Sequence, residues 1–104
     1  MKKFSEKVLE LTGKIPSCKV TTYSEIARAL GNPKTSRAVG NALNKNQHPE
    51  IIPCYRVVRN DGSVGGFALG PMEKIRRLKR DGIVIKKDKI ELEKYFHSFR
   101  KQSH

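Results

Sequence analysis

A Gly-Asn-Pro turn at residues 31–33 separates two short segments with helical periodicity, and this feature constrains the fold more than any other. The first segment, about residues 23–30, begins with a capping-box pattern. In such a box the Thr22 hydroxyl and the Glu25 carboxylate can satisfy two backbone N–H groups that the start of a helix leaves unpaired. The second segment runs from about residue 35 to about residue 46. Two short helices joined by a tight glycine-containing turn predict a helix-turn-helix.

The second of these helices is made mainly of small residues, namely Ser36, Ala38, Gly40, Asn41 and Ala42. With so little bulk on its outer face it can approach another backbone closely, either a second helix or a nucleic-acid groove. Arg37 is the one long side chain expected to project from it. Alanine and glycine offer no groups that read base edges, which disfavours a sequence-specific transcription factor.

The chain carries a large excess of positive charge. Its 22 Lys and Arg residues against 10 Asp and Glu give a formal net charge of +12 over 104 residues. This excess favours a polyanionic partner, nucleic acid before an anionic membrane surface, although solubility or an assembly role would also account for it. No apolar run approaches the roughly 20 residues that a membrane span requires, and the amphipathic start does not resemble a secretory signal. We expect an intracellular protein that makes no membrane contact.

The flanking segments predict further helices and a small β wing. An amphipathic helix is expected over residues 3–13. The apolar, β-rich run 51–58, the turn 59–62 and the glycine-rich stretch 63–70 together predict a hairpin or wing.

Helical periodicity predicts another helix from Pro71 to Asp81, ended by Gly82. Its apolar side chains are expected to face inward and its basic ones solvent: Met72, Ile75 and Leu78 inward; Lys74, Arg76, Arg77, Lys79 and Arg80 outward. Beyond it, either residues 83–92 form a hairpin or residues 89–92 begin a last helix. Residues 98–104 are expected to fray.

Two cysteines, Cys18 and Cys54, can form at most one disulfide, which a reducing compartment would not maintain. A thiol is strongly nucleophilic near neutral pH when a positive or hydrogen-bonding neighbour lowers its pKa from about 8.5. From its position alone, Cys54 is either such a nucleophile or a small buried apolar residue. Cys18 lies in a polar turn and is interpreted as structural or incidental. The histidines have no ligand spacing with the cysteines, so we expect no metal site and no cofactor.

The segments around Cys54 closely resemble the DNA-binding domain of the O6-alkylguanine-DNA alkyltransferases. The matching segments are Lys19–Tyr23, Arg37–Gly40, Ile52–Val58 and Asp61–Phe67. The resemblance covers residues 4–85 and implies a winged helix-turn-helix, mainly α with a small β wing. It implies minor-groove binding, flipping of the damaged guanine and irreversible, single-turnover transfer of its O6-alkyl group to Cys54. We expect one domain over residues 1–104, with residues 86–104 as a basic C-terminal extension.

The resemblance also assigns residues to the chemistry. The family's Pro-Cys-His-Arg motif is Pro-Cys-Tyr-Arg here, so Tyr55 stands where a histidine relays the thiol proton, and Asp81 replaces its glutamate partner. A tyrosine is a poor base at neutral pH, but its hydroxyl can hydrogen-bond a thiolate or pass a proton to Asp81, which predicts slow transfer. Asn46 matches an asparagine that braces the site, and Tyr23 a tyrosine that crowds the target phosphate.

The remaining site residues follow from the same resemblance. The expected DNA-contacting residues are Thr35, Ser36, Arg37, Ala38, Gly40, Asn41, Arg59 and Asn60. Arg37 resembles an arginine that fills the gap left by the flipped base. The expected substrate pocket consists of Phe67, Ala68, Val57 and Leu43. At the position of Phe67, family members often have a tyrosine whose hydroxyl supports guanine O6. Phe67 cannot donate a hydrogen bond, so the resemblance leaves backbone N–H groups near Ala68 to support O6.

The expected partner is double-stranded DNA containing O6-alkylguanine, bound by a monomer, together with a fused or associated repair nuclease. The alternative is an alkyltransferase-like protein that flips the lesion without transferring its alkyl group. Such proteins usually carry Trp or Ala at the nucleophile position, so the cysteine at position 54 favours transfer.

Overall fold

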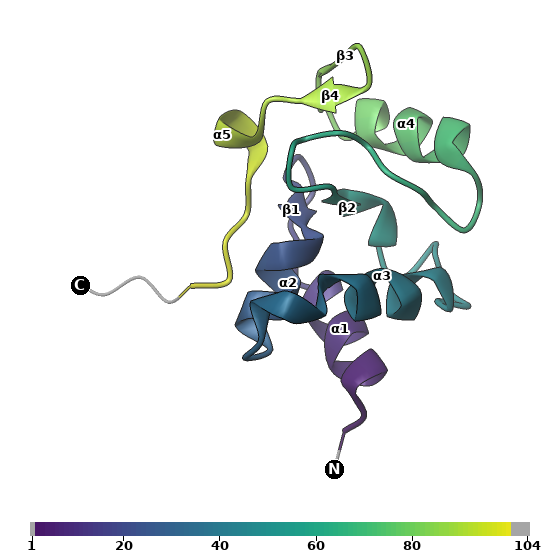
Figure 1. Ribbon diagram of the computed structural model, residues 1–104. Helices are drawn as coiled ribbons and strands as arrows, with labels where there is room; N and C mark the ends of the chain where they lie inside the picture. The colour runs from purple at the N-terminus through teal and green to yellow at the C-terminus, as the bar shows by residue number, and fades with distance from the viewer. Residues whose placement is uncertain (1, 101–104) are drawn as a thin grey trace.

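The computed structural model describes residues 2–100 and shows a winged helix-turn-helix, as expected (Figure 1). The elements are α1 (Phe4–Thr12), β1 (Thr21–Thr22), α2 (Tyr23–Ala29), α3 (Ser36–Asn44), β2 (Val57–Val58), α4 (Pro71–Arg80), β3 (Ile85–Lys86), β4 (Lys89–Ile90) and α5 (Leu92–Tyr95). Single 3-10 turns lie at Pro33–Thr35 and Cys54–Arg56. Within the described residues, no helix is long and apolar enough to cross a membrane.

The helix-turn-helix forms where the sequence predicts it. Thr22 Oγ1 accepts a hydrogen bond from the Glu25 backbone N–H at 3.1 Å, which begins α2. The turn after α2 passes through Gly31, whose φ of 103° favours glycine, and Asn32 Oδ1 accepts from the Lys34 backbone N–H at 3.0 Å. The buried faces of α1, α2 and α3 then pack into one apolar cluster: Val8, Ile26, Ala27, Val39, Ala42 and Leu43.

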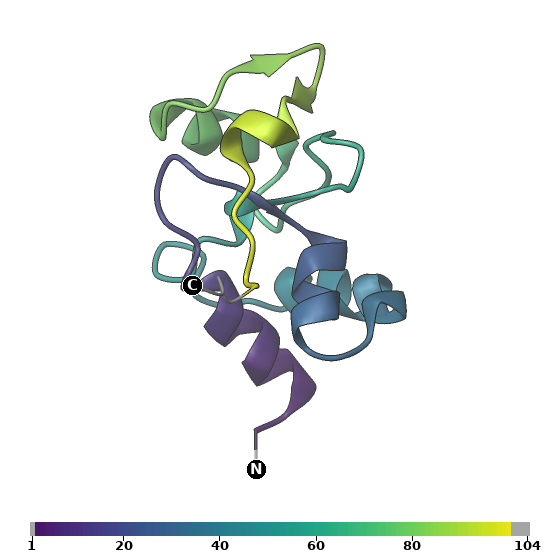
Figure 2. The ribbon, with the colours of Figure 1, turned by 90° about the vertical axis from the view of Figure 1, so that its left-hand side faces the viewer.

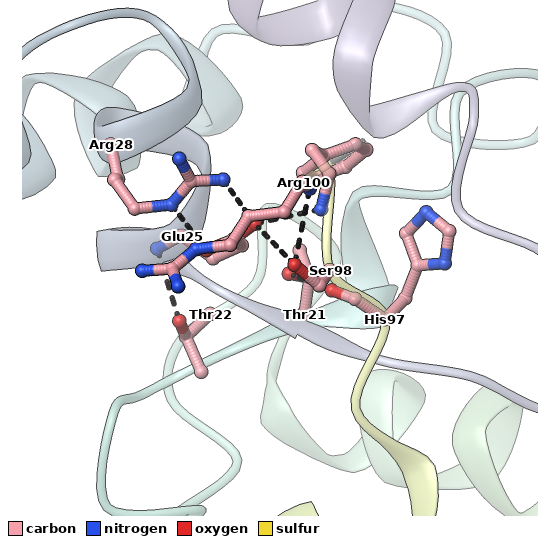
Figure 3. A network of polar contacts seen from close by, with 8 residues as sticks. Thr21, Thr22, Glu25, Arg28, His97, Ser98 and Arg100 are labelled. Carbon is pink, nitrogen blue, oxygen red and sulfur yellow. Dashed lines mark hydrogen bonds and ion pairs between the residues drawn. The ribbon is translucent and has the colours of Figure 1, made fainter. Parts of the chain in front are cut away.

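The second half of the expected capping box does not form, because the Glu25 carboxylate holds the C-terminal segment instead (Figure 3). Glu25 Oε2 accepts from the Phe99 backbone N–H at 2.7 Å and from Ser98 Oγ at 3.2 Å. The Arg28 guanidinium donates to both carboxylate oxygens, at 2.9 and 2.8 Å. The expectation that the chain frays from residue 98 is therefore wrong for Ser98 and Phe99; residues 101–104 lie outside the described residues.

The segment before Ser98 extends this attachment along β1. The His97 backbone N–H donates to Val20 O at 2.7 Å, and Thr21 Oγ1 donates to His97 O at 2.8 Å. Figure 2 shows the chain leaving α5 and running past β1 toward α1. Phe99 packs against the apolar cluster that includes side chains of α1, α2 and α3.

The predicted hairpin over residues 51–70 is wrong in its pairing. Val57 and Val58 in β2 pair in parallel with Thr21 and Thr22 in β1. Residues 51–56 form turns rather than a strand, since Pro53 cannot donate to a ladder. The loop after β2 forms the wing and contacts β3–β4, which pair antiparallel. Of the two alternatives for the end of the chain, the hairpin forms, and a short helix, α5, follows it from Leu92.

The predicted facing of α4 is wrong for Met72 and Lys74, and the Arg77 side chain, predicted to face solvent, is only 15% exposed. Met72 is 81% exposed, whereas Lys74 has no accessible surface. Lys74 and Leu78 lie one turn apart on the same face of the helix and are both buried. This face covers the second apolar cluster, which lies between β1–β2, α4, β3–β4 and α5: Val20, Tyr55, Val58, Val64, Leu78, Ile83, Ile90 and Tyr95.

Candidate active site and DNA interface

A cleft of about 660 Å³ lies between α3 and the loop that follows β2. Its lining residues are Tyr23, Ser36, Arg37, Gly40, Asn41, Asn44, Arg59, Asn60 and Gly66. All of these except Asn44 and Gly66 are expected site residues, so the fold brings the two expected contact segments to one surface. Thr35, at the N-cap of α3, and Ala38, within α3, do not line it.

The surface of the cleft combines small side chains with positive charge. Gly40 lies against Tyr23, since a Cβ on Gly40 would meet the tyrosine ring at 3.8 Å. Among the described residues, no carboxylate forms an ion pair with Arg37 or Arg59. Asn60 Oδ1 accepts from the Ser24 backbone N–H at 3.3 Å, which connects the wing loop to α2. The surface therefore suits a phosphate backbone that approaches closely.

Cys54 begins the 3-10 turn before β2 and is 5% exposed. The Val57 backbone N–H donates to Cys54 O and closes this turn. Asn46 Nδ2 donates to Cys54 Sγ at 3.4 Å and to Ile52 O at 3.2 Å. Asn46 Oδ1 accepts from the His48 backbone N–H at 2.9 Å, which fixes the amide's orientation. An oriented amide N–H facing the sulfur stabilises the thiolate form, which is the nucleophile.

The Tyr55 hydroxyl is hydrogen-bonded to Asp81 and Arg56 rather than to this thiol. Its hydroxyl donates to Asp81 Oδ2 at 2.8 Å, and Arg56 Nε donates to the same oxygen at 3.0 Å. Arg56 also donates to the Tyr55 oxygen at 3.0 Å and to Ile15 O at 2.8 Å. Tyr55 and Asp81 are therefore in direct contact, and within the described residues no hydrogen bond joins Tyr55 to Cys54 Sγ.

The residues expected to form the pocket differ in exposure. Phe67 is half-buried and packs against both apolar clusters, with the Arg77 guanidinium 5.5 Å from its ring centroid. Ala68 is exposed. Val57 and Leu43 are buried in the same cluster as Cys54. Tyr23 connects the cleft to this cluster, and its burial raises the pKa of its hydroxyl.

The sequence interpretation missed Lys74. Its Nζ donates to Val57 O at 2.7 Å and to Gly66 O at 2.9 Å, so it joins the strand after Cys54 to the loop before Phe67. Burial lowers the pKa of Lys74 to about 7, with the charge on Cys54 acting to raise it and Arg59 to lower it. The four-residue spacing to Leu78 was the signal available in the sequence.

The fold and the cleft define a winged helix-turn-helix DNA-binding domain that holds a cysteine beside its recognition helix. Residues 3–83 match the family model described as "6-O-methylguanine DNA methyltransferase, DNA binding domain". The chain belongs to this family, whose members act in DNA repair.

Two curated relatives extend the comparison. The chain is 51% identical over 90 residues to a bifunctional methyltransferase/endonuclease of Picrophilus torridus, covering 86% of this chain and 30% of the relative. It is 40% identical over 83 residues to a methylated-DNA–protein-cysteine methyltransferase of Methanothermobacter thermautotrophicus, covering 79% of this chain and 46% of the relative. The chain thus spans less than half the length of these two relatives.

Two solved structures are similar to this fold. Atl1 of S. pombe, in complex with damaged DNA containing O6-carboxymethylguanine, superposes with a TM-score of 0.83 at 29% identity, covering 94% of this chain and 99% of that one. The OGT protein of Mycobacterium tuberculosis, in complex with DNA, superposes with a TM-score of 0.75 at 32% identity, covering 79% of this chain and 50% of that one.

Proposed function

We propose that this chain repairs DNA by transferring the alkyl group of O6-alkylguanine to Cys54. The thiolate sulfur forms a bond to the alkyl carbon while the bond from that carbon to O6 breaks. Guanine keeps the electron pair and takes up a proton. The product is a thioether, a poor leaving group, so each molecule acts once. The observation that carries the proposal is the contact between Asn46 and Cys54 Sγ, which orients an amide N–H toward the sulfur of the candidate nucleophile.

We propose that the cleft receives the DNA that carries the lesion. O6 cannot be attacked inside the base stack, so the nucleotide must be flipped out at a cost of a few kcal/mol. We propose that α3 enters the minor groove through its small residues and that Arg37 fills the vacated position. Tyr23 lines the cleft and packs against the cluster that contains Cys54, which supports the proposal that its ring crowds the backbone of the flipped nucleotide.

A second candidate function is lesion binding without transfer. It is favoured by the orientation of Tyr55, whose hydroxyl proton is donated to Asp81 rather than placed at the sulfur. It is also favoured by the similarity to Atl1, which spans almost all of both chains.

The intact mass of the protein after incubation with duplex DNA containing O6-methylguanine separates the two functions. We expect a gain of one methyl group in the wild type and in Cys18→Ser, and none in Cys54→Ser. Cys18 is exposed, so its replacement controls for nonspecific alkylation. Tight, lesion-dependent binding by the wild type with no mass gain would overturn the transfer proposal in favour of lesion binding.

We further propose that a repair nuclease, fused or associated, is a partner in addition to damaged DNA. Two relatives, 51% and 52% identical to this chain, are named bifunctional methyltransferase/endonucleases, which supports this partner. Cleavage of lesion-containing DNA by such an endonuclease should increase when this chain is present. Equal cleavage with and without the chain would contradict the partnership.

A further inference from the structure

Lys74 is a buried cation without a carboxylate partner. It has no accessible surface, and among the described residues no Asp or Glu forms an ion pair with it. Two backbone carbonyls, Val57 O and Gly66 O, accept its hydrogen bonds. A buried ammonium is costly unless an opposite charge lies near it. The Lys74 amine is therefore either neutral at this position or balanced by the negative charge of a nearby group that is not a carboxylate.

The group that can supply this anion is Cys54. The carbonyl that Lys74 binds belongs to Val57, whose N–H closes the 3-10 turn on Cys54 O. Lys74 is thus attached to the peptide that ends the turn carrying the thiol. Charge on Cys54 is also the influence that favours the charged form of Lys74 against burial.

The groups expected to accept or relay the thiol proton make other hydrogen bonds or cannot accept it. The Tyr55 hydroxyl donates to Asp81, and Arg56 contacts both. Asn46 donates an N–H to Sγ, but an amide cannot take a proton from it at neutral pH. An amine that already donates two N–H groups to carbonyls retains a lone pair, and this lone pair can accept one.

We propose that Lys74 sets the charge state of Cys54: the proton leaves Sγ and is held on Lys74 Nζ, which produces a buried thiolate–ammonium pair. This pair replaces the histidine relay that residue 55 does not provide. The proton balance closes during transfer, because the sulfur becomes a neutral thioether and the proton is passed to the guanine, whose O6 keeps the electrons of the broken bond. Lys74 is thus a positioning residue that acts through the charge of Cys54, and the inference rests on the proposed transfer function.

The titratable groups around Lys74 come from three elements besides α4. Tyr23 from α2 faces it, with Nζ 5.8 Å from the ring centroid. Arg59 from the wing loop opposes its protonation, and Cys54 from the 3-10 turn favours it. On α4 itself, Arg77 lies against Tyr55 and Phe67 instead. Of the two groups in this set that can become anions, a free thiol ionises much closer to neutral pH than a free tyrosine, which titrates near pH 10.

The test measures the thiolate of Cys54 directly, without DNA. In a Cys18→Ser background, the ultraviolet absorbance of the thiolate is followed against pH, with the Cys18→Ser, Cys54→Ser protein subtracted. Lys74→Met, which keeps the volume and removes the charge, should lower the thiolate fraction at pH 7 about tenfold, because an adjacent opposite charge shifts such a titration by roughly one to three pH units. Lys79→Met is the matched control on the exposed side of α4 and should leave the titration unchanged. Identical titrations for the two variants would overturn the proposal.

A reciprocal measurement covers the case in which Lys74→Met does not fold. Coupled groups influence each other equally, so removing the thiolate must lower the pKa of Lys74 further below its value of about 7. NMR of lysine labelled at Cε reports this pKa in the wild type and in Cys54→Ser. A purely structural role for Lys74 would leave the pKa unchanged, and that result would refute the pairing.

Failure of this inference is distinguishable from failure of the transfer proposal. Coupled titrations in a protein that never gains a methyl group would support the ion pair and overturn transfer. Methyl gain at equal rates in the wild type and Lys74→Met, with uncoupled titrations, would overturn the ion pair and leave transfer standing.

Discussion

The Tyr55 hydroxyl donates to Asp81 Oδ2 at 2.8 Å and therefore turns its only proton away from the neighbouring Cys54. Arg56 donates to the same carboxylate oxygen at 3.0 Å and to the tyrosine oxygen at 3.0 Å, so the three side chains form a closed set. A group that accepts a proton at position 55 would face Asp81 directly.

Replacing Tyr55 with histidine should accelerate alkyl transfer. An imidazole beside Asp81 accepts protons near neutral pH, and positioned acid–base groups contribute roughly 10²–10⁴-fold to rates. We expect transfer from O6-methylguanine DNA to become at least about tenfold faster in single-turnover assays. Tyr55→Phe is the control and should change the rate by less than about twofold, because the tyrosine donates its proton to Asp81. Slower transfer in Tyr55→His than in Tyr55→Phe would contradict this prediction.

Replacing Arg37 with alanine should impair repair of duplex DNA selectively. Arg37 is exposed at the cleft without an ion-pair partner among the described residues, so its loss removes the side chain proposed to hold the flipped state. Since flipping costs a few kcal/mol and each 1.4 kcal/mol is about tenfold in rate, we expect at least about a tenfold loss on duplex DNA. Transfer from free O6-alkylguanine base, measured in parallel, should be unaffected. An equal loss on both substrates would assign Arg37 to the chemistry or to the fold.

Binding to undamaged DNA should depend steeply on salt and little on sequence. The chain has a net charge of +12, and the exposed residues of α3 include Ala38, which cannot read bases. We expect the affinity to fall log-linearly, by about 10³-fold or more between roughly 50 and 200 mM salt if six or more phosphates are neutralised. Fluorescence anisotropy with several unrelated duplexes tests this expectation. A flat salt dependence, or a strong preference for one sequence, would rule out a phosphate-dominated interface.

Replacing Glu25 with glutamine should destabilise the fold in a pH-dependent manner. Hydrogen bonds from Arg28 first, and also from the Phe99 backbone and Ser98, lower the pKa of Glu25 below its value in the unfolded chain. The charged carboxylate therefore contributes stability above the unfolded-state pKa, and this contribution is lost as the pH falls through the folded-state pKa.

Urea unfolding at a series of pH values measures this effect. At pH 7 we expect Glu25→Gln to lower the free energy of unfolding by about 1–3 kcal/mol, with the two curves converging in acid. Glu50→Gln, at an exposed carboxylate, is the control and should leave the stability unchanged. A difference between wild type and Glu25→Gln that is the same at every pH would show that the carboxylate's charge is not responsible.

Local signals determined much of the fold. The Thr22 cap, the Gly31 turn and the small residues of the second helix predict the helix-turn-helix correctly, because each signal acts within a few residues along the chain. The short motifs around Cys54 identified the family by resemblance, and the family model confirms it. The roles assigned to the individual site residues stay predictions, although the structure gathers most of the residues expected to contact DNA around one cleft.

The tertiary structure decided what depends on partners distant in sequence. Lys74 is buried because carbonyls 17 and 8 residues away accept its hydrogen bonds, which helical periodicity cannot reveal. The Glu25 carboxylate accepts a hydrogen bond from the Phe99 backbone N–H, 74 residues away, instead of capping α2, and that contact holds Phe99 in place. Strand pairing is also nonlocal, so Val57 pairs with Thr21 rather than with the glycine-rich stretch at residues 63–70. Helical periodicity indicates which side chains share a face of a helix. The hydrogen-bond partners of buried polar groups depend on the packed chain, because every buried polar group needs a partner at the place where the fold puts it.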